Sequence, residues 1–158
     1  MKKMVVALLL TAMFLVNAGE VRNILKNGDF RAGMAEWEIL GKPIRTETKN
    51  GKIALDIQRS SDAGSLKLQQ IQSALQVGNT YRLYFTVECE KAQTRPMVFS
   101  YRMRTKSKNL GLFKQLPLRQ GTQKLFIELI PGQNSDDPND PPIISFYLGE
   151  LDGKITFF

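Results

Sequence analysis

Apolar and polar residues alternate along several short segments of this 158-residue chain. Residues 81–89 are the clearest case, with a large, mainly apolar side chain at every second position: Tyr81, Leu83, Phe85 and Val87. Successive side chains of a β-strand point to opposite faces of its sheet, so this pattern predicts a strand with one buried face. Similar patterns predict strands at residues 52–59, 65–72, 96–104, 123–130, 143–148 and 154–158.

Turn-forming residues separate the predicted strands. Gly, Asn, Asp and Pro gather at residues 27–29, 50–51, 62–64, 78–79 and 121, and along the segment 131–142. Short strands at this spacing, each with one apolar face, indicate an all-β fold, a two-sheet antiparallel β-sandwich of eight or more strands. We expect residues 131–142 to form an exposed loop, and we expect the core to contain Leu83, Phe85, Leu125, Ile127 and Phe146.

The first 19 residues differ from the rest of the chain. Lys2 and Lys3 precede an apolar run at residues 4–16, and Ala18 and Gly19 follow it. This order is typical of a secretory signal peptide, and a membrane-spanning helix would need roughly 20 apolar residues. A buried N-terminal helix or strand is the alternative. We predict a signal peptide at residues 1–19, one domain at 20–158, no transmembrane segment, and a secreted, periplasmic or cell-surface location.

Two residue counts restrict the chemistry. The chain has no histidine, which excludes histidine-based acid–base catalysis, a Ser-His-Asp triad and typical zinc sites. Its single cysteine, Cys89, excludes an intramolecular disulfide. The place of Cys89 in the alternation of residues 81–89 indicates a buried side chain.

The formal charge of +7 falls to +5 if Lys2 and Lys3 leave with a signal peptide. A basic balance favours anionic partners, and for a secreted protein acidic glycans or lipid headgroups fit better than nucleic acid. Mild basicity is equally common on an ordinary solvated surface, so the charge alone selects no partner.

Oxygen-bearing side chains crowd one part of the long loop: Asp136, Asp137, Asn139 and Asp140. The segment lacks the glycine and the terminal glutamate of an EF-hand loop, and three prolines lie within or beside it, at 138, 141 and 142. A solvated surface loop is the better interpretation, and a cation site is the alternative.

Several short motifs follow one another through residues 23–158. N-I-L-K-N-G-D-F at residues 23–30 precedes Gly33 and Trp37, and further motifs lie at residues 68–75, 78–85, 146–149 and 153–158. In this order and spacing they resemble bacterial carbohydrate-binding modules of the cellulose- and xylan-binding type. Those modules belong to families 4, 9 and 22 and are found beside glycoside hydrolases.

The resemblance implies a galactose-binding-like jelly roll over residues 20–158 and a non-catalytic, polysaccharide-binding function. Phe30 and Trp37 would pack on the core of such a fold. Members of the family commonly have a structural calcium site, with a glutamate directly after the opening phenylalanine and aspartates in the last strand. Arg31 follows that phenylalanine here, and only Asp152 lies near the last strand. We therefore expect no calcium site and no other metal or cofactor.

Sugar binding requires flat aromatic faces and hydrogen-bonding side chains. If the apolar positions of each strand face the core, six suitable residues point outward: Gln69, Arg82, Tyr84, Glu88, Arg102 and Tyr147. We predict that they line one glycan-binding cleft, and the arginines favour an acidic glycan through carboxylate pairing. The alternative is an ordinary outer sheet face, on which tyrosine and arginine are common.

Three classes of function remain open at this point. A carbohydrate-binding module agrees best with the motifs. A secreted or envelope interaction protein that keeps the jelly roll without a sugar site is the alternative, with a glycoside hydrolase or an envelope component as a partner. An enzyme is disfavoured, because no pair of acidic residues has the sequence context of the carboxylate couple that a glycosidase needs.

Overall fold

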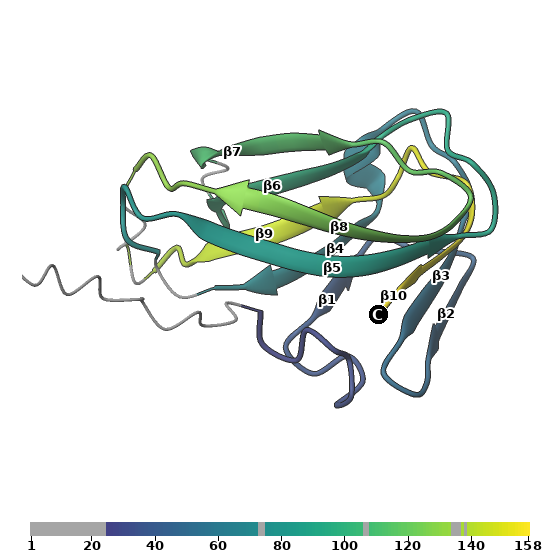
Figure 1. The fold of residues 1–158 in the computed structure, drawn as a ribbon. Coiled ribbons are helices and arrows are strands. Elements are labelled where there is room, and N and C mark those ends of the chain that lie inside the picture. The colour runs from purple at the N-terminus through teal and green to yellow at the C-terminus, as the bar shows by residue number, and fades with distance from the viewer. Residues whose placement is uncertain (1–24, 73–74, 106–107, 134–136, 138) are drawn as a thin grey trace, which may run out of the picture.

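The computed structural model describes residues 25–72, 75–105, 108–133, 137 and 139–158, and Figure 1 shows the fold. The predicted signal peptide and Asp136 lie outside these residues. Among the described residues, no helix is both long and apolar enough to cross a membrane.

Two five-stranded antiparallel sheets face each other (Figure 1), which confirms the predicted β-sandwich. The strands of sheet A are, in spatial order, β1 (Glu38–Leu40), β4 (Lys67–Ile71), β9 (Pro142–Tyr147), β6 (Met97–Met103) and β7 (Asn109–Leu116). The strands of sheet B are, in spatial order, β2 (Arg45–Thr48), β3 (Ile53–Ile57), β10 (Gly153–Phe157), β5 (Tyr81–Cys89) and β8 (Gly121–Leu129). The only described helix is the short 3-10 turn η1 (Ala63–Ser65).

Each of the seven predicted strands is present, but β1, β2 and β7 were not predicted. The strands β1 and β2 are three and four residues long and largely exposed, so they carry no apolar stripe. In β7 the sequence alternation is interrupted, because the large apolar residues Leu112 and Phe113 are adjacent; the register with β6 also shifts, between Tyr101 and Arg102. Leu112 faces the core, while the neighbouring Phe113 is exposed.

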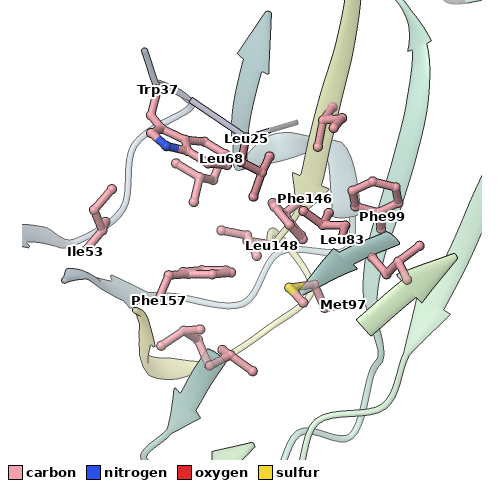
Figure 2. Close-up of a cluster of buried hydrophobic side chains, with 14 of the residues drawn as sticks. Leu25, Trp37, Ile53, Leu68, Leu83, Met97, Phe99, Phe146, Leu148 and Phe157 are labelled. Carbon is pink, nitrogen blue, oxygen red and sulfur yellow. The ribbon is translucent and has the colours of Figure 1, made fainter. Parts of the chain in front are cut away.

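The core lies between the two sheets and has Phe146 near its centre (Figure 2). The Phe146 ring lies 5.1–6.4 Å from four other aromatic rings: Trp37, Phe85, Phe99 and Phe157. Of the five predicted core residues, Leu83, Ile127 and Phe146 are buried, and Phe85 and Leu125 are half-buried against the cluster. Alternation therefore predicted the facing of these strands correctly.

The segment before β1 closes one end of the sandwich, below β1 in Figure 1. Asn27 has a φ of +46°, a left-handed conformation that asparagine tolerates better than most residues. The indole Nε1 of Trp37 donates to the Asn27 carbonyl at 3.0 Å, and the Phe30 and Trp37 rings lie 5.3 Å apart. Both rings are buried, which confirms that they pack on the core.

The prediction of an exposed loop at residues 131–142 is wrong at its ends. Pro131, Asp140 and Pro142 are buried. The Asp140 carboxylate accepts a hydrogen bond of 2.6 Å from the amide of Thr105. The side chain is buried because it joins the turn after β6 to the chain that enters β9.

Candidate functional site

The outer face of sheet A brings four polar side chains and one aromatic side chain, one from each of its five strands, into one row. Across the sheet, Cα register pairs Glu38 with Gln69, Gln69 with Ser145, Ser145 with Ser100, and Ser100 with Phe113. The residues on either side of Ser145 are Ile144 and Phe146, which belong to the core. The row therefore lies on the face of the sheet that points away from the core. We call these five residues the polar row.

Three atoms of the polar row are buried without a hydrogen-bond partner among the described residues. They are Oε1 of Gln69 and the Oγ atoms of Ser100 and Ser145. Buried polar atoms are nearly always hydrogen-bonded in folded proteins, and leaving one unpaired costs about 1–3 kcal/mol. Gln69, Ser100 and Ser145 thus carry hydrogen-bonding capacity that no described residue uses.

A hollow of about 240 Å³ lies over the same face. Its lining comprises Lys67, Ser100, Arg102, Asn109, Phe113 and Tyr147. Phe113 is 58% exposed, and the Nζ atom of Lys67 lies 5.0 Å from the centroid of the Tyr147 ring. The hollow therefore combines two aromatic side chains with hydroxyl, amide and cationic groups.

Hydrogen bonds fix several polar side chains around the hollow. Gln69 donates from Nε2 to Oε2 of Glu38 at 2.8 Å, and Arg104 lies 3.7 Å from the same oxygen. Arg102 donates from Nη1 to the carbonyl oxygens of Met103 and Arg104 at 3.3 and 3.2 Å. Asn109 accepts at Oδ1 from two amides of its own strand, so its side chain is held in place.

The six residues predicted to bind a glycan do not line one cleft. Gln69, Arg102 and Tyr147 lie on the outer face of sheet A, whereas Arg82, Tyr84 and Glu88 belong to β5 in sheet B. Two opposite faces of the sandwich carry them. Alternation shows which side chains point outward, but it cannot show which of two sheets a strand will join.

The sequence prediction missed several side chains that surround the hollow or hold its polar groups: Glu38, Lys67, Ser100, Asn109 and Phe113. Glu38 belongs to a three-residue strand that has no sequence pattern. Phe113 follows Gly111, which has a φ of +111° within β7. Glycine is depleted in strands and marks bulges, so Gly111 weakened the strand signal there, and without a predicted strand no facing could be assigned to Phe113.

The residues where a family calcium site was considered take part in ion pairs. Arg31 lies 3.2 Å from the carboxylate of Asp29, and Lys91 lies 2.6 Å from that of Asp152. The Lys91 ammonium group lowers the pKa of Asp152. Among the residues that the structure describes, no group of three or more His, Cys, Asp or Glu side chains could hold a metal ion.

Comparison with solved structures identifies the fold. The second N-terminal cellulose-binding domain of β-1,4-glucanase C from Cellulomonas fimi matches with a TM-score of 0.73 and 14% identity, over 89% of this chain and 92% of that domain. A structure described as "CBM4 structure and function" matches with a TM-score of 0.67 and 16% identity, over 81% of this chain and 92% of the other. At these identities the likeness shows the β-sandwich fold alone.

Sequence comparisons give two further findings. No curated protein matches the chain. A family model described as "Carbohydrate binding domain" matches residues 22–137, well over half of the sequence. The chain therefore belongs to the carbohydrate binding domain family.

Proposed function

We propose that this chain is an exported, non-catalytic module that binds polysaccharide across the outer face of sheet A. The observation that carries the proposal is the hollow on this face, in which the aromatic rings of Phe113 and Tyr147 lie beside hydroxyl, amide and cationic side chains, at one end of the polar row. Family membership supports the same conclusion.

The side chains around the hollow match the two kinds of surface on a sugar. The apolar face of a pyranose ring can stack on an exposed aromatic ring, such as that of Phe113. Sugar hydroxyl groups can form hydrogen bonds with the polar side chains that line the hollow, Ser100, Arg102 and Asn109. A chain of sugars lying along the row would meet both kinds of contact.

We further propose that the preferred polysaccharide is acidic. Lys67 and Arg102 line the hollow, and no described carboxylate does so. Glu38, the one acidic residue of the polar row, is engaged by Gln69 and Arg104. The carboxylate of a uronic acid could therefore pair with Lys67 or Arg102 and would not be repelled by an unpaired protein carboxylate. Hydrogen bonds between charged groups are stronger than those between neutral groups.

A binding role without catalysis is supported by the acidic groups at this site. Glycoside hydrolysis generally uses two carboxylates placed on either side of the scissile bond. The polar row contains the single carboxylate of Glu38, which forms an ion pair with Arg104. Export, inferred from the sequence of residues 1–19, would bring the module to glycans outside the cytoplasm and to a glycoside hydrolase or envelope partner there.

Affinity electrophoresis tests the proposed function. The wild-type protein would run through native gels that contain xyloglucan, galactomannan, polygalacturonate or alginate, beside a non-binding protein of similar charge. Retardation by any of them that Phe113→Ala reduces supports the proposal. Ile44→Ala is a matched control, because Ile44 is exposed and lies outside both sheets. Mobility unchanged by every polysaccharide would instead favour an interaction protein without a sugar site.

A further inference from the structure

Sheet B carries a pair of exposed aromatic rings on the opposite face of the sandwich. Tyr84 of β5 and Phe126 of β8 are register partners, and their ring centroids lie 6.0 Å apart with an interplanar angle of 31°. The two side chains are 65% and 61% exposed. Their neighbours Leu83 and Ile127 face the core, so the two rings lie wholly on the outer surface.

Polar side chains border this aromatic pair at both ends. On one side Arg82 and Glu128 form an ion pair of 3.2 Å. On the other side Thr86 and Lys124 are register partners on the same face. A stable protein interface buries about 1,200–2,000 Å² around an apolar centre, and two rings enclosed by charged groups offer much less. A sugar ring needs only one aromatic face and nearby hydrogen-bonding groups.

The outer face of β5 continues from the aromatic pair to a second hollow, of about 510 Å³. Glu88 lines this hollow and lies four residues from Tyr84 on the same face, which is about 13 Å along a strand. Thr156 and Ala54 follow Glu88 across the sheet in register, on β10 and β3. The small side chain of Ala54 lowers the surface there, so the hollow is open to an oligosaccharide lying along β5.

The charges in the second hollow are balanced, in contrast to those in the hollow on sheet A. Its lining includes three carboxylates and three ammonium groups: Glu47, Glu88, Glu90, Lys49, Lys52 and Lys154. Lys154 lies 3.3 Å from the carboxylate of Glu47. A surface with this balance suits an uncharged ligand, because an acidic one would also meet three carboxylates.

We infer that the outer face of sheet B is a second glycan-binding surface, specific for neutral polysaccharide. Tyr84 and Phe126 stack on the sugar rings, and Glu88 and Thr156 bind hydroxyl groups in the hollow. The surface shares no residue with the site proposed on sheet A and so extends the proposed function. One protein molecule can then hold two polysaccharide chains on opposite faces.

The aromatic pair also has a purely structural explanation, because cross-strand aromatic pairs stabilise a sheet by roughly 0.2–1 kcal/mol. The test must therefore separate binding from stability. Threonine is the replacement of choice, since it favours strands but has no ring. Thermal unfolding of each variant shows whether the fold is intact.

The test compares wild-type protein with three variants in native gels that contain xyloglucan, galactomannan or hydroxyethylcellulose. A sheet B variant carries Tyr84→Thr and Phe126→Thr, a sheet A variant carries Phe113→Ala and Tyr147→Ala, and the third combines all four. Ile44→Ala is the matched control. We expect the sheet A variant to remain retarded by a neutral polysaccharide and the combined variant to migrate like a non-binding protein. Unfolding midpoints should stay close to those of the wild type.

Two results would overturn the second surface. One is a sheet B variant that is retarded like the wild type while the sheet A variant loses all retardation, a result that leaves the proposed function intact. The other is wild-type protein that no neutral polysaccharide retards. In that case polygalacturonate decides separately whether the site on sheet A binds. Should the sheet B variant fail to fold, Phe126→Thr alone gives the same comparison on the edge strand β8.

Discussion

The Nζ atom of Lys67 lies 5.0 Å from the centroid of the Tyr147 ring, across the paired strands β4 and β9. The contact holds a cation beside an aromatic ring at the edge of the hollow on sheet A. One uronic acid unit could then stack on the Tyr147 ring and pair its carboxylate with Lys67. Lys67 is therefore the residue with which the proposed preference for acidic glycans can be tested.

Lys67→Gln should weaken binding of polygalacturonate while leaving binding of a neutral polysaccharide on the same gel system nearly unchanged. Loss of one charge-assisted hydrogen bond, about 1.5–3 kcal/mol, corresponds to a tenfold or greater fall in affinity. The difference from wild type should shrink as salt rises, because exposed charges are screened. Lys42→Gln removes the same charge as a control, because Lys42 is exposed and lies outside both sheets. An equal loss for both variants would show that only net charge matters.

Phe146→Ala should destabilise the fold by about 3–5 kcal/mol, the usual cost of truncating a buried phenylalanine. Phe146 is 2% exposed and contacts rings from both sheets, Phe99 in sheet A and Phe85 and Phe157 in sheet B. Phe85→Ala should cost less, because Phe85 is only half-buried. Urea unfolding followed by circular dichroism measures both values. A Phe146→Ala variant as stable as Phe85→Ala would show that the centre of the core lies elsewhere.

The facing of side chains in the long strands could be predicted from the sequence, and the pairing of strands could not. Burial requires an apolar residue at every second position, so β5, β8 and β9 show their inner faces directly. The sheet that a strand joins depends on distant partners: β10, at the end of the chain, lies between β3 and β5. For that reason the six residues predicted to line one cleft lie on the outer faces of two different sheets.

Two residues in the motifs that resemble the family, Gly149 and Asn27, have structural roles that can be seen only in the fold. Gly149 follows β9, and a Cβ atom built there would lie 2.3 Å from both the carbonyl oxygen of Asp62 and the Oγ atom of Ser65. Only glycine allows that close approach of two chain segments. Asn27 holds the opening loop through its side-chain bonds to Gly33 and Ala35. These residues determine the fold, and the site residues lie elsewhere.

Cys89 should not react with Ellman's reagent at pH 8 until the protein unfolds. Burial raises the pKa of the Cys89 thiol to about 11, and the Glu88 carboxylate adds to the shift. Between pH 9 and about 11 the Cys89 thiol is therefore protonated in the native state and ionised in the unfolded state. Because the unfolded state binds fewer protons there, the contribution of Cys89 to the free energy of unfolding falls as pH rises through this range. Cys89→Ala should lack that part of the pH dependence. Rapid labelling of native protein at pH 8 would contradict the buried position.

Calcium should raise the melting temperature little or not at all. Arg31 and Lys91 form ion pairs with Asp29 and Asp152, the acidic residues nearest the expected family site. A ligand held at 100 times its dissociation constant would add about 2.7 kcal/mol to the free energy of unfolding. Differential scanning fluorimetry in millimolar calcium, with and without chelator, measures the shift. A clear rise that the chelator reverses would reveal a calcium site, with Asp137 and Asp140 the next residues to test.

Binding by the outer face of sheet A is tested most directly by titrating the most strongly retarding polysaccharide into wild-type protein and into Phe113→Ala/Tyr147→Ala. Calorimetry gives the affinity, and urea unfolding gives the stability of each protein. Two lost stacking contacts, each worth about 0.5–1.5 kcal/mol, should lower the affinity at least fivefold. Ile44→Ala should bind like the wild type. An unchanged affinity in a well-folded double variant would contradict the proposed site and place the glycan on another surface.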